Sequence, residues 1–418
     1  MLLSSNSYFT VIAFSLIVIL SYIFSIISKK TNIPSVLMLI LLGIEIKQMM
    51  IHFDLPEVDY FGTLEIVGIV GLIMIVLEAA LDLKLTKEKV GLIVKSFFAA
   101  LLMLIGTAFV CAAIIHYYII PDNFIQSLVY AVPISVLSSA IIIPSVGGLV
   151  DHKKEFMIYE GTFSDILGIL FFYFLIGTEE SATAGSIASN VLINIALTIG
   201  IAVLVSYILI YVFQAIRTEV KLFLLIAILL LLYAIGKLSG LSSLIIILIF
   251  GLILNNHKLF VKGKLSSWIK RDRVKEMLED FHVVTLETAF VVRTFFFVIF
   301  GITITLSTLL NLNVALVSIL MVLAFYVVRL IFLRIFIGAK LLPELFIAPR
   351  GLITILLFFA IPEQYHTKAF DPAILMYTVI ITSLVMTFGL IKYGDNGKET
   401  EESSEESSTE LETINDTE

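Results

Sequence analysis

The sequence predicts an all-α, polytopic membrane protein with about 13 transmembrane helices. Of its 418 residues, 59% are apolar and 15% are charged, whereas a soluble domain has about 45–50% apolar and about 25% charged residues. The apolar residues form repeated stretches of about 20, which is the length that crosses a hydrocarbon core about 30 Å thick. The strands of an outer-membrane barrel would alternate apolar and polar residues, and these stretches do not.

Thirteen stretches fit this description. In approximate boundaries they are residues 8–28, 33–51, 61–82, 91–118, 124–149, 155–177, 187–215, 219–236, 241–256, 282–308, 312–337, 341–361 and 371–392. The positive-inside rule tests the count, because cytoplasmic connections carry an excess of Lys and Arg. Alternate connections and helix ends hold 22 Lys and Arg on one side and 3 on the other. We therefore expect the N-terminus outside and the C-terminus in the cytoplasm, in a plasma membrane of the bacterial cytoplasmic type.

Two of the spans are interrupted by prolines. The fifth contains Pro133 and Pro144, and the twelfth contains Pro343 and Pro349. Proline inside a helix removes a backbone donor. Broken backbone at membrane depth is tolerated only where protein or a water-filled cavity covers it.

These two spans occupy the same place, fifth of six, in the two halves of the chain. The halves are residues 8–177 and 219–392, within a transmembrane domain of residues 1–392, and the linker helix 187–215 inverts the second half. Paired broken helices in inverted repeats indicate a transporter binding site. We therefore expect two inverted six-helix repeats whose broken helices cross.

Two segments are expected to lie outside the membrane core. The tail 393–418 is rich in charge and poor in apolar residues, so it should be a disordered cytoplasmic tail. From Asp395 onward it has ten acidic residues and one lysine, so the rest of the chain carries about +2 of the total −7. The connection Asn255–Asp280, with Trp268 among basic residues, should include an amphipathic helix at the interface.

Asp165 is the ionisable residue that most strongly suggests a binding site for a proton or a cation. It lies about ten residues into the sixth span, near the expected middle of the bilayer, where ionisable residues are costly and usually functional. A carboxylate there binds a proton or a dehydrated small cation, but hardly both at once. That competition is sufficient for antiport if the site faces each side of the membrane in turn. Ser138 and Ser139, in the broken fifth span, would complete an oxygen cage suited to a hard cation.

Several other charged residues are expected within or near spans. Glu160 should pair with a buried cation, either Arg329 or Arg293, because an unpaired buried charge costs several kcal/mol. Arg350 should neutralise the dipole of a half-helix at the crossover. Glu78 and Asp82 would form an acidic cytoplasmic funnel, or alternatively an ordinary pair of helix-end carboxylates.

Other classes of protein fit the sequence less well. Intramembrane hydrolases need an HExxH motif, paired aspartates, or a serine with a histidine in reach, and none of the six histidines lies deep in a span. A membrane sensor or scaffold would not need paired broken helices or a buried aspartate. The single cysteine, Cys111, excludes a disulfide framework and a cysteine metal site. We expect no enzyme activity, no cofactor, no resident metal and no nucleic-acid partner.

Five motifs resemble the monovalent cation:proton antiporter superfamily, with its sodium/proton exchanger-like membrane domain, over roughly residues 8–392. They are TNIPSVLMLILLGIEI, LEAALDL, VLSSAIIIP, EGTFSD and APRGLITILL. The pair EGTFSD and APRGL, in this order, is fairly specific. VLSSAIIIP is closer to the branch that contains potassium efflux systems than to the Thr-Asp-Pro form of the exchangers.

The resemblance implies a homodimer in the lipid bilayer, with a dimerisation domain and a core domain that moves like an elevator. It implies that Asp165 is the transport carboxylate, with Ser164, Ser138 and Ser139 at the ion site, and that Glu160 pairs with Arg329. Position 164 is serine where exchangers usually have asparagine and electrogenic relatives a second aspartate. With one site carboxylate we expect electroneutral exchange of Na⁺, preferred over K⁺, for H⁺. The alternative is a channel-like or proton-coupled potassium efflux protein.

Overall fold

The computed structural model describes residues 7–31, 33–53, 61–86, 88–177, 184–215, 221–239, 243–260, 271–304 and 311–393. These residues form helices and contain no strand. Two expectations lie outside the described residues: the interfacial helix around Trp268, and the acidic tail beyond Tyr393.

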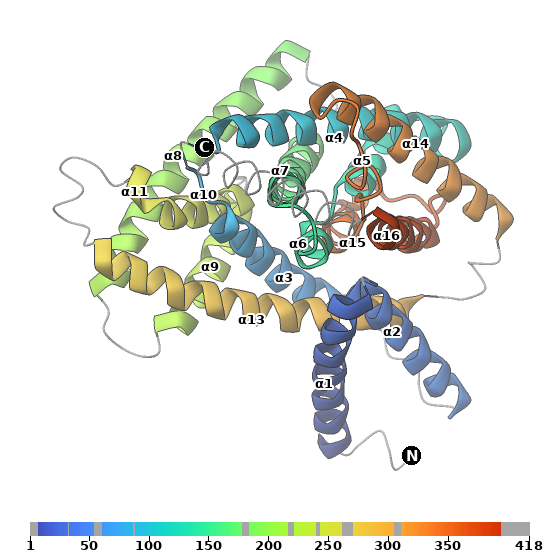
Figure 1. Ribbon diagram of the computed structural model, residues 1–418, viewed down its shortest axis with the longest axis horizontal. Helices are drawn as coiled ribbons and strands as arrows, with labels where there is room; N and C mark the ends of the chain where they lie inside the picture. Colours follow the sequence, from blue (N-terminus) through green and yellow to red (C-terminus); the bar gives the residue numbers. More distant parts are fainter. Residues whose placement is uncertain are drawn as a thin grey trace, which may run out of the picture.

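Sixteen helical elements follow one another along the described chain, and Figure 1 labels the α-helices among them. They are α1 (Ser7–Thr31), α2 (Ser35–His52), α3 (Phe61–Asp82), α4 (Val90–Tyr118), α5 (Phe124–Ser135), α6 (Ser139–Ser145), α7 (Asp151–Ile176), α8 (Ala184–Ala215), α9 (Lys221–Leu238), α10 (Ser243–Asn255), α11 (His257–Phe260), α13 (Arg271–Thr303), α14 (Leu312–Phe336), α15 (Leu352–Phe359), the 3-10 helix η2 (Glu363–Tyr365) and α16 (Ala373–Tyr393).

The helices pack in two groups, which Figure 1 shows side by side. The scaffold group comprises α1, α2, α3, α8, α9, α10 and α13, with the long α13 lying along α2 and α3. The site group comprises α4, α5, α6, α7, α14, α15 and α16, with α4 packed on α5, α7 and α14. Contacts between the groups are sparser and involve mainly α3 against α7 and α15. This division places both interrupted spans in one group.

Small residues allow the closest helix contact in the scaffold group. A Cβ on Gly43 of α2 would lie 2.2 Å from the carbonyl oxygen of Val298 and 2.8 Å from the Cα of Gly301 on α13. No side chain fits in that space, so the two backbones approach directly. Such small-residue contacts are common between membrane helices, where there is no hydrophobic drive to bring helices together.

Large apolar side chains cover much of the outer surface. On α1 they include Val11, Ile12, Phe14 and Ile19, each about half exposed or more. Within the described residues, nine helical segments are long and apolar enough to cross a membrane, judged by length and composition. Together these features confirm the all-α, multi-pass class. The count of 13 and the inverted repeats stay predictions.

The tenth and twelfth predicted spans differ in detail from the structure. α13 begins at Arg271 rather than near residue 282, because its charged first turns continue the helix beyond the apolar stretch that defined the prediction. In the twelfth span only α15 is regular helix, and residues 342–351 form turns and extended chain. A hydropathy window measures the length of an apolar stretch. It therefore detects neither a helix that continues through charged residues nor irregular backbone within an apolar stretch.

Candidate functional site

The two interrupted spans meet at the centre of the site group. α5 ends at Ser135 and α6 begins at Ser139, so the backbone between them is unwound. The N–H of Ser138 donates to the carbonyl oxygen of Pro349 at 2.9 Å. A Cβ on Gly351 would lie 2.5 Å from Ser138 Oγ, so this crossing requires glycine. The broken segments therefore cross in direct backbone contact.

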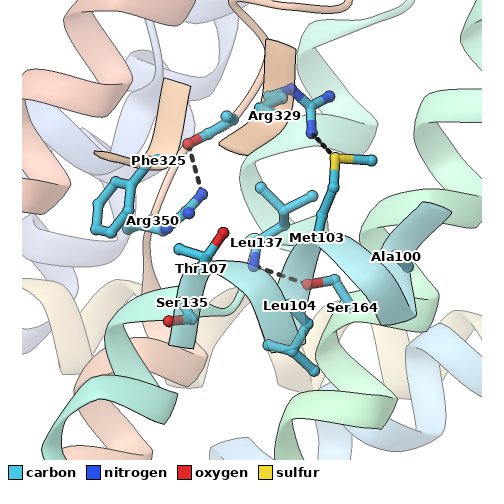
Figure 2. Close-up of a pocket in the computed structure, with 11 residues that line it drawn as sticks. Ala100, Met103, Leu104, Thr107, Ser135, Leu137, Ser164, Phe325, Arg329 and Arg350 are labelled. Atoms are coloured by element: carbon cyan, nitrogen blue, oxygen red, sulfur yellow. Dashed lines mark hydrogen bonds between the residues drawn. The ribbon is translucent and has the colours of Figure 1, made fainter. Parts of the chain in front are cut away.

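The interruption of the fifth span lies between its prolines rather than at them. Pro133 is inside α5 and Pro144 is inside α6. Side chains of α7 bind amide groups that the unwinding leaves free: the N–H of Leu137 donates to Ser164 Oγ at 2.9 Å (Figure 2). Ser164, predicted at the ion site, thus holds the unwound backbone through its hydroxyl oxygen.

Asp165 lies on α7 beside this unwound stretch and is 3% exposed. Its Oδ2 accepts hydrogen bonds from the hydroxyl and the N–H of Ser139, the latter at 3.2 Å. Its Oδ1 has no hydrogen-bond partner, and neither has the hydroxyl of Ser138 or of Thr162. Buried polar atoms are normally hydrogen-bonded, so unpartnered ones need an explanation. Carboxylate and hydroxyl oxygens with free lone pairs are suited to a proton or a hard cation.

Glu160 and Arg329 form a buried ion pair between α7 and α14. Arg329 Nη1 lies 2.6 Å from Glu160 Oε1 and Nη2 lies 3.0 Å from Oε2, a two-pronged arrangement. The same guanidinium donates from Nε and Nη2 to the carbonyl oxygen of Glu344, at 3.0 and 2.9 Å. Charge-assisted bonds in this fork geometry are strong and directional. Arg329 therefore joins α7, α14 and the turn that contains Glu344, before α15.

A second pair continues this network and was missed from the sequence. The carboxylate of Glu344 is 1% exposed and lies 2.9 Å from Lys153 Nζ, at the start of α7. Glu344 falls inside the predicted twelfth span, so the cost of ionisable residues at membrane depth was a signal for it. Lys153 looked only like one of many basic residues in a cytoplasmic loop.

Arg350 lies at the C-terminal end of α5. Its Nε donates to the carbonyl oxygen of Ile134 at 2.8 Å, and its Nη1 to that of Ala348 at 2.9 Å. The guanidinium also stacks 4.2 Å from the ring centre of Phe325, and Figure 2 shows these side chains together. The last carbonyls of a helix lack intrahelical partners and carry partial negative charge. The Arg350 guanidinium therefore lies where a positive charge can compensate the partial negative charge at the end of α5.

Arg293 does not contact Glu160. Its Nη2 lies 2.9 Å from Glu78 Oε2, which links α13 to α3 within the scaffold group. This corrects the idea that either arginine might pair with Glu160, because the pairing depends on which helix lies beside α7. The order of the residues in the sequence and their expected depth in the membrane do not show which helix lies beside α7.

A cavity leads from this pair toward Ser139, the hydrogen-bond partner of Asp165. Glu78 and Arg293 line a cavity of about 200 Å³ together with Ser139 and Ala140 of α6. A wider cavity of about 900 Å³, also lined by Ile143, contains Asp82 and continues toward the ends of α3 and α10. Asp82 lies 3.7 Å from a ring nitrogen of His282 there. Glu78 and Asp82 thus line neighbouring cavities, and each has a basic neighbour. Their role as a cytoplasmic funnel stays a prediction.

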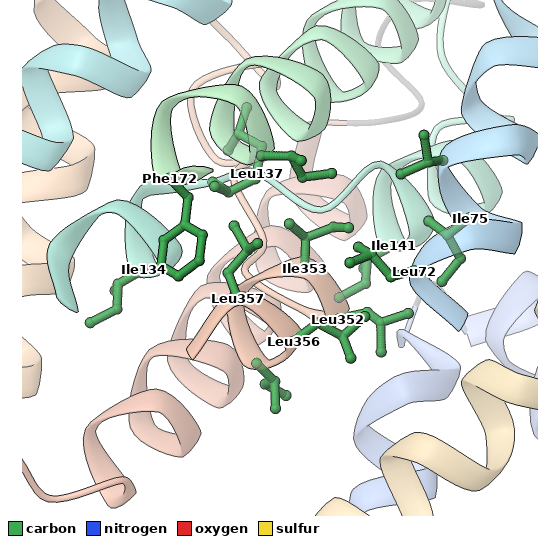
Figure 3. Close-up of a cluster of buried hydrophobic side chains, with 14 of the residues drawn as sticks. Leu72, Ile75, Ile134, Leu137, Ile141, Phe172, Leu352, Ile353, Leu356 and Leu357 are labelled. Atoms are coloured by element: carbon green, nitrogen blue, oxygen red, sulfur yellow. The ribbon is translucent and has the colours of Figure 1, made fainter. Parts of the chain in front are cut away.

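Apolar side chains close the other side of the crossover. Figure 3 shows Leu352, Ile353 and Leu356 of α15 around the unwound stretch, with Ile134 and Phe172 nearby; all are buried. On the α4 side a polar void of only about 10 Å³ remains between Thr107, Ser135 and Ser164, about enough for one water centre. The 200 Å³ cavity therefore reaches Ser139, the hydrogen-bond partner of Asp165, whereas Asp165 itself is buried.

No group of three or more His, Cys, Asp or Glu side chains arranged to hold a metal ion occurs within the described residues. The polar chemistry of the site thus rests on one unpaired carboxylate, serine and threonine hydroxyls, and backbone groups. These donors are oxygen atoms, which suit a proton or a hard cation.

Comparisons with known proteins agree with this geometry. Residues 15–392 match the family described as sodium/hydrogen exchanger, transmembrane. No curated protein matches the chain. The solved structure of the sodium proton antiporter MjNhaP1 from Methanocaldococcus jannaschii at pH 8 is similar, with a TM-score of 0.65 at 21% identity. The similarity covers 93% of this chain and 99% of that one.

A second structure of that archaeal antiporter, from an electron-microscopy map, gives a TM-score of 0.63 at 19% identity, over 93% of this chain and 96% of the other. At these identities the likeness shows a shared fold. The match to the family covers most of the chain and the whole of the site described above.

Proposed function

Because the chain belongs to the transmembrane sodium/hydrogen exchanger family, we propose that it exchanges a monovalent cation for a proton, with Asp165 binding the two in competition. The observation that carries this proposal is the Asp165 carboxylate itself. It is buried at the crossover, one of its oxygens has no hydrogen-bond partner, and an open cavity approaches its partner Ser139.

Competition follows from the charge at this position. Asp165 has hydroxyl and amide partners but no lysine or arginine in hydrogen-bond contact. A buried carboxylate without a cationic partner is costly when it is ionised and no cation is bound to it. Either a proton or a cation removes that cost, so binding of one favours release of the other.

The charge count supports electroneutral exchange. Glu160 and Glu344 are buried carboxylates, and each has a basic partner in Arg329 or Lys153. Among the fully buried carboxylates of the described residues, this leaves Asp165 to change its charge during transport. One carboxylate exchanges one cation for one proton, which moves no net charge.

The division into two helix groups supports alternating access of the elevator type. The crossover, Asp165 and their supporting ion pairs all belong to the site group, while sparser contacts join it to the scaffold group. We propose that the site group moves as a unit against the scaffold. The chain would act as a homodimer in the cytoplasmic membrane, with its N-terminus outside and its C-terminus in the cytoplasm.

We propose Na⁺ as the preferred ion. The first test reconstitutes the protein in liposomes with an internal pH dye and adds Na⁺, Li⁺, K⁺ or Rb⁺ in turn. The expected result is Na⁺-driven proton movement that does not change when the membrane potential is clamped. A ranking led by K⁺ would correct the ion, and flux that depends on the clamp would correct the stoichiometry.

The role of Asp165 is tested in the same assay with Asp165→Asn, which keeps the shape and removes the charge. We expect no exchange with any cation, although the variant still elutes as a folded protein in size-exclusion chromatography. Asp151→Asn is a matched control, because Asp151 lies exposed at the start of the same helix. Exchange that survives in Asp165→Asn would remove this residue from the mechanism.

A further inference from the structure

The ion pair Glu78–Arg293 has features that a purely structural pair would not need. The two side chains are 15% and 17% exposed, and they face the cavity that leads to Ser139. Arg293 Nε is buried without a hydrogen-bond partner. Arg329, by comparison, uses all three of its nitrogens in bonds to Glu160, Glu344 or Met103. The Arg293 guanidinium thus has one strong contact, to Glu78, and its side chain lines the cavity.

This pair lies close to the ion site but belongs to the other helix group. Arg293 Nη1 is 3.5 Å from the carbonyl oxygen of Ala140, the residue after the Asp165 partner Ser139. Glu78 and Arg293 carry opposite charges and line the same cavity as Ser139, the hydrogen-bond partner of Asp165. α3 and α13, however, pack in the scaffold group, whereas Asp165 lies in the site group.

We propose that Glu78 and Arg293 set the cation affinity of Asp165 at one membrane face only, the face to which the 200 Å³ cavity opens. The inference rests on the proposed exchange function and deepens it. Arg293 is a fixed positive charge at the entrance and opposes an incoming cation, and Glu78 neutralises it. When the site group moves to face the other side, Asp165 leaves the field of the pair.

The proposal predicts changes of opposite sign. Glu78→Gln leaves an unpaired guanidinium beside the cavity, so the KM for Na⁺ at this face should rise on the order of 10-fold. Arg293→Gln leaves an unpaired carboxylate, so the KM should fall. The double variant, with neither charge, should return close to the wild-type value. Arg293→Lys keeps the charge and should resemble the wild type.

The experiment measures KM for Na⁺ separately from each side, in everted and right-side-out membrane vesicles of a host without background antiport. The pH on the side of cation addition is kept alkaline, so that proton competition is small. Glu287→Gln and Arg334→Gln are matched controls, since each removes one exposed charge, on α13 and α14 respectively. Both controls should leave KM unchanged on both sides.

The expected result is a pair of opposite KM changes on one side and none on the other. Changes of the same sign in both single variants would indicate lost packing and overturn the inference. Equal changes on both sides would overturn it as well, because the pair would then act in both states. If the wild-type protein exchanges no cation at all, the proposed function itself fails. Wild-type exchange with symmetric changes in the variants rejects only the present inference.

Discussion

Two arginine–carboxylate pairs lie near the candidate ion site, and their surroundings differ. The Glu160–Arg329 side chains are 0% and 4% exposed, and every nitrogen of Arg329 has a partner. The Glu78–Arg293 side chains are 15% and 17% exposed, face a cavity, and leave Arg293 Nε without a partner. The first pair connects helices within the site group, and the second connects helices of the scaffold group.

The comparison suggests that burial separates structural charges from charges that act on the transported ion. A fully buried pair is costly to break, because removal of one partner leaves the other as an uncompensated buried charge. A pair that lines a cavity costs less free energy to break, and we propose that it can influence an ion in that cavity. Four ion pairs of decreasing burial in this protein test that relation.

Glu160–Arg329 should show the largest loss of stability. We expect Glu160→Gln or Arg329→Gln to lower the free energy of unfolding by about 3–5 kcal/mol, since each leaves an uncompensated buried group. The double variant should cost less than the sum of the two. SDS-induced unfolding of the solubilised protein measures all four states of the cycle. Additive losses would show that the two residues do not depend on each other.

Lys153–Glu344 should come second and should be asymmetric. Lys153 is 20% exposed and Glu344 only 1% exposed. Lys153→Gln leaves a buried carboxylate without its partner, whereas Glu344→Gln removes the buried charge itself. We expect a loss of about 2–3 kcal/mol for Lys153→Gln and a smaller loss for Glu344→Gln. Equal losses from the same unfolding assay would contradict the view that desolvation of Glu344 is the dominant cost.

Glu78–Arg293 should contribute less to stability, although we propose a role for it in transport. We expect each single Gln variant to lower the free energy of unfolding by about 1 kcal/mol, because water in the cavity partly solvates the remaining charge. Thermal unfolding in detergent, followed by the loss of soluble dimer or monomer, provides the measurement. A loss as large as that of the Glu160 variants would place this pair in the structural class and weaken the comparison.

Lys89–Glu155 should show the smallest effect. Its side chains are 41% and 33% exposed, and the hydrogen bond to Glu155 raises the pKa of Lys89. A raised lysine pKa stabilises the fold fully below the ordinary lysine value, and this stabilisation is lost as the pH rises through the raised one. We expect Lys89→Gln to cost about 0–1 kcal/mol at neutral pH and nothing in strong alkali. A large cost in strong alkali would show that packing, and not the charge, is responsible.

Much of the site could be predicted from the sequence, because charge in an apolar span is a strong signal. That signal selected Asp165, Glu160 and the arginines, and proline placed the interruption near Ser138. Both broken spans do meet in the structure, through the Ser138 N–H and the Pro349 carbonyl. The transport roles of these residues stay predictions.

Pairing could not be predicted from the sequence in the same way. Arg293 and Arg329 both lie within apolar spans, and their depth does not say which one faces Glu160. The answer depends on α14 lying against α4 in the site group and α13 lying against α3 in the scaffold group. The Ser164–Leu137 bond likewise depends on where the backbone unwinds, which prolines three and eight residues from Val136 did not define.

The central claim is that a proton and a cation compete for Asp165, and proton release on cation binding tests it most directly. Solubilised protein in a weakly buffered solution is titrated with Na⁺ across a series of pH values, and the change in pH is recorded. The account predicts that the wild type releases up to about one proton per subunit in part of this range and that Asp165→Asn releases none. Undiminished proton release from Asp165→Asn, or Na⁺ binding to the wild type without any release, would contradict it.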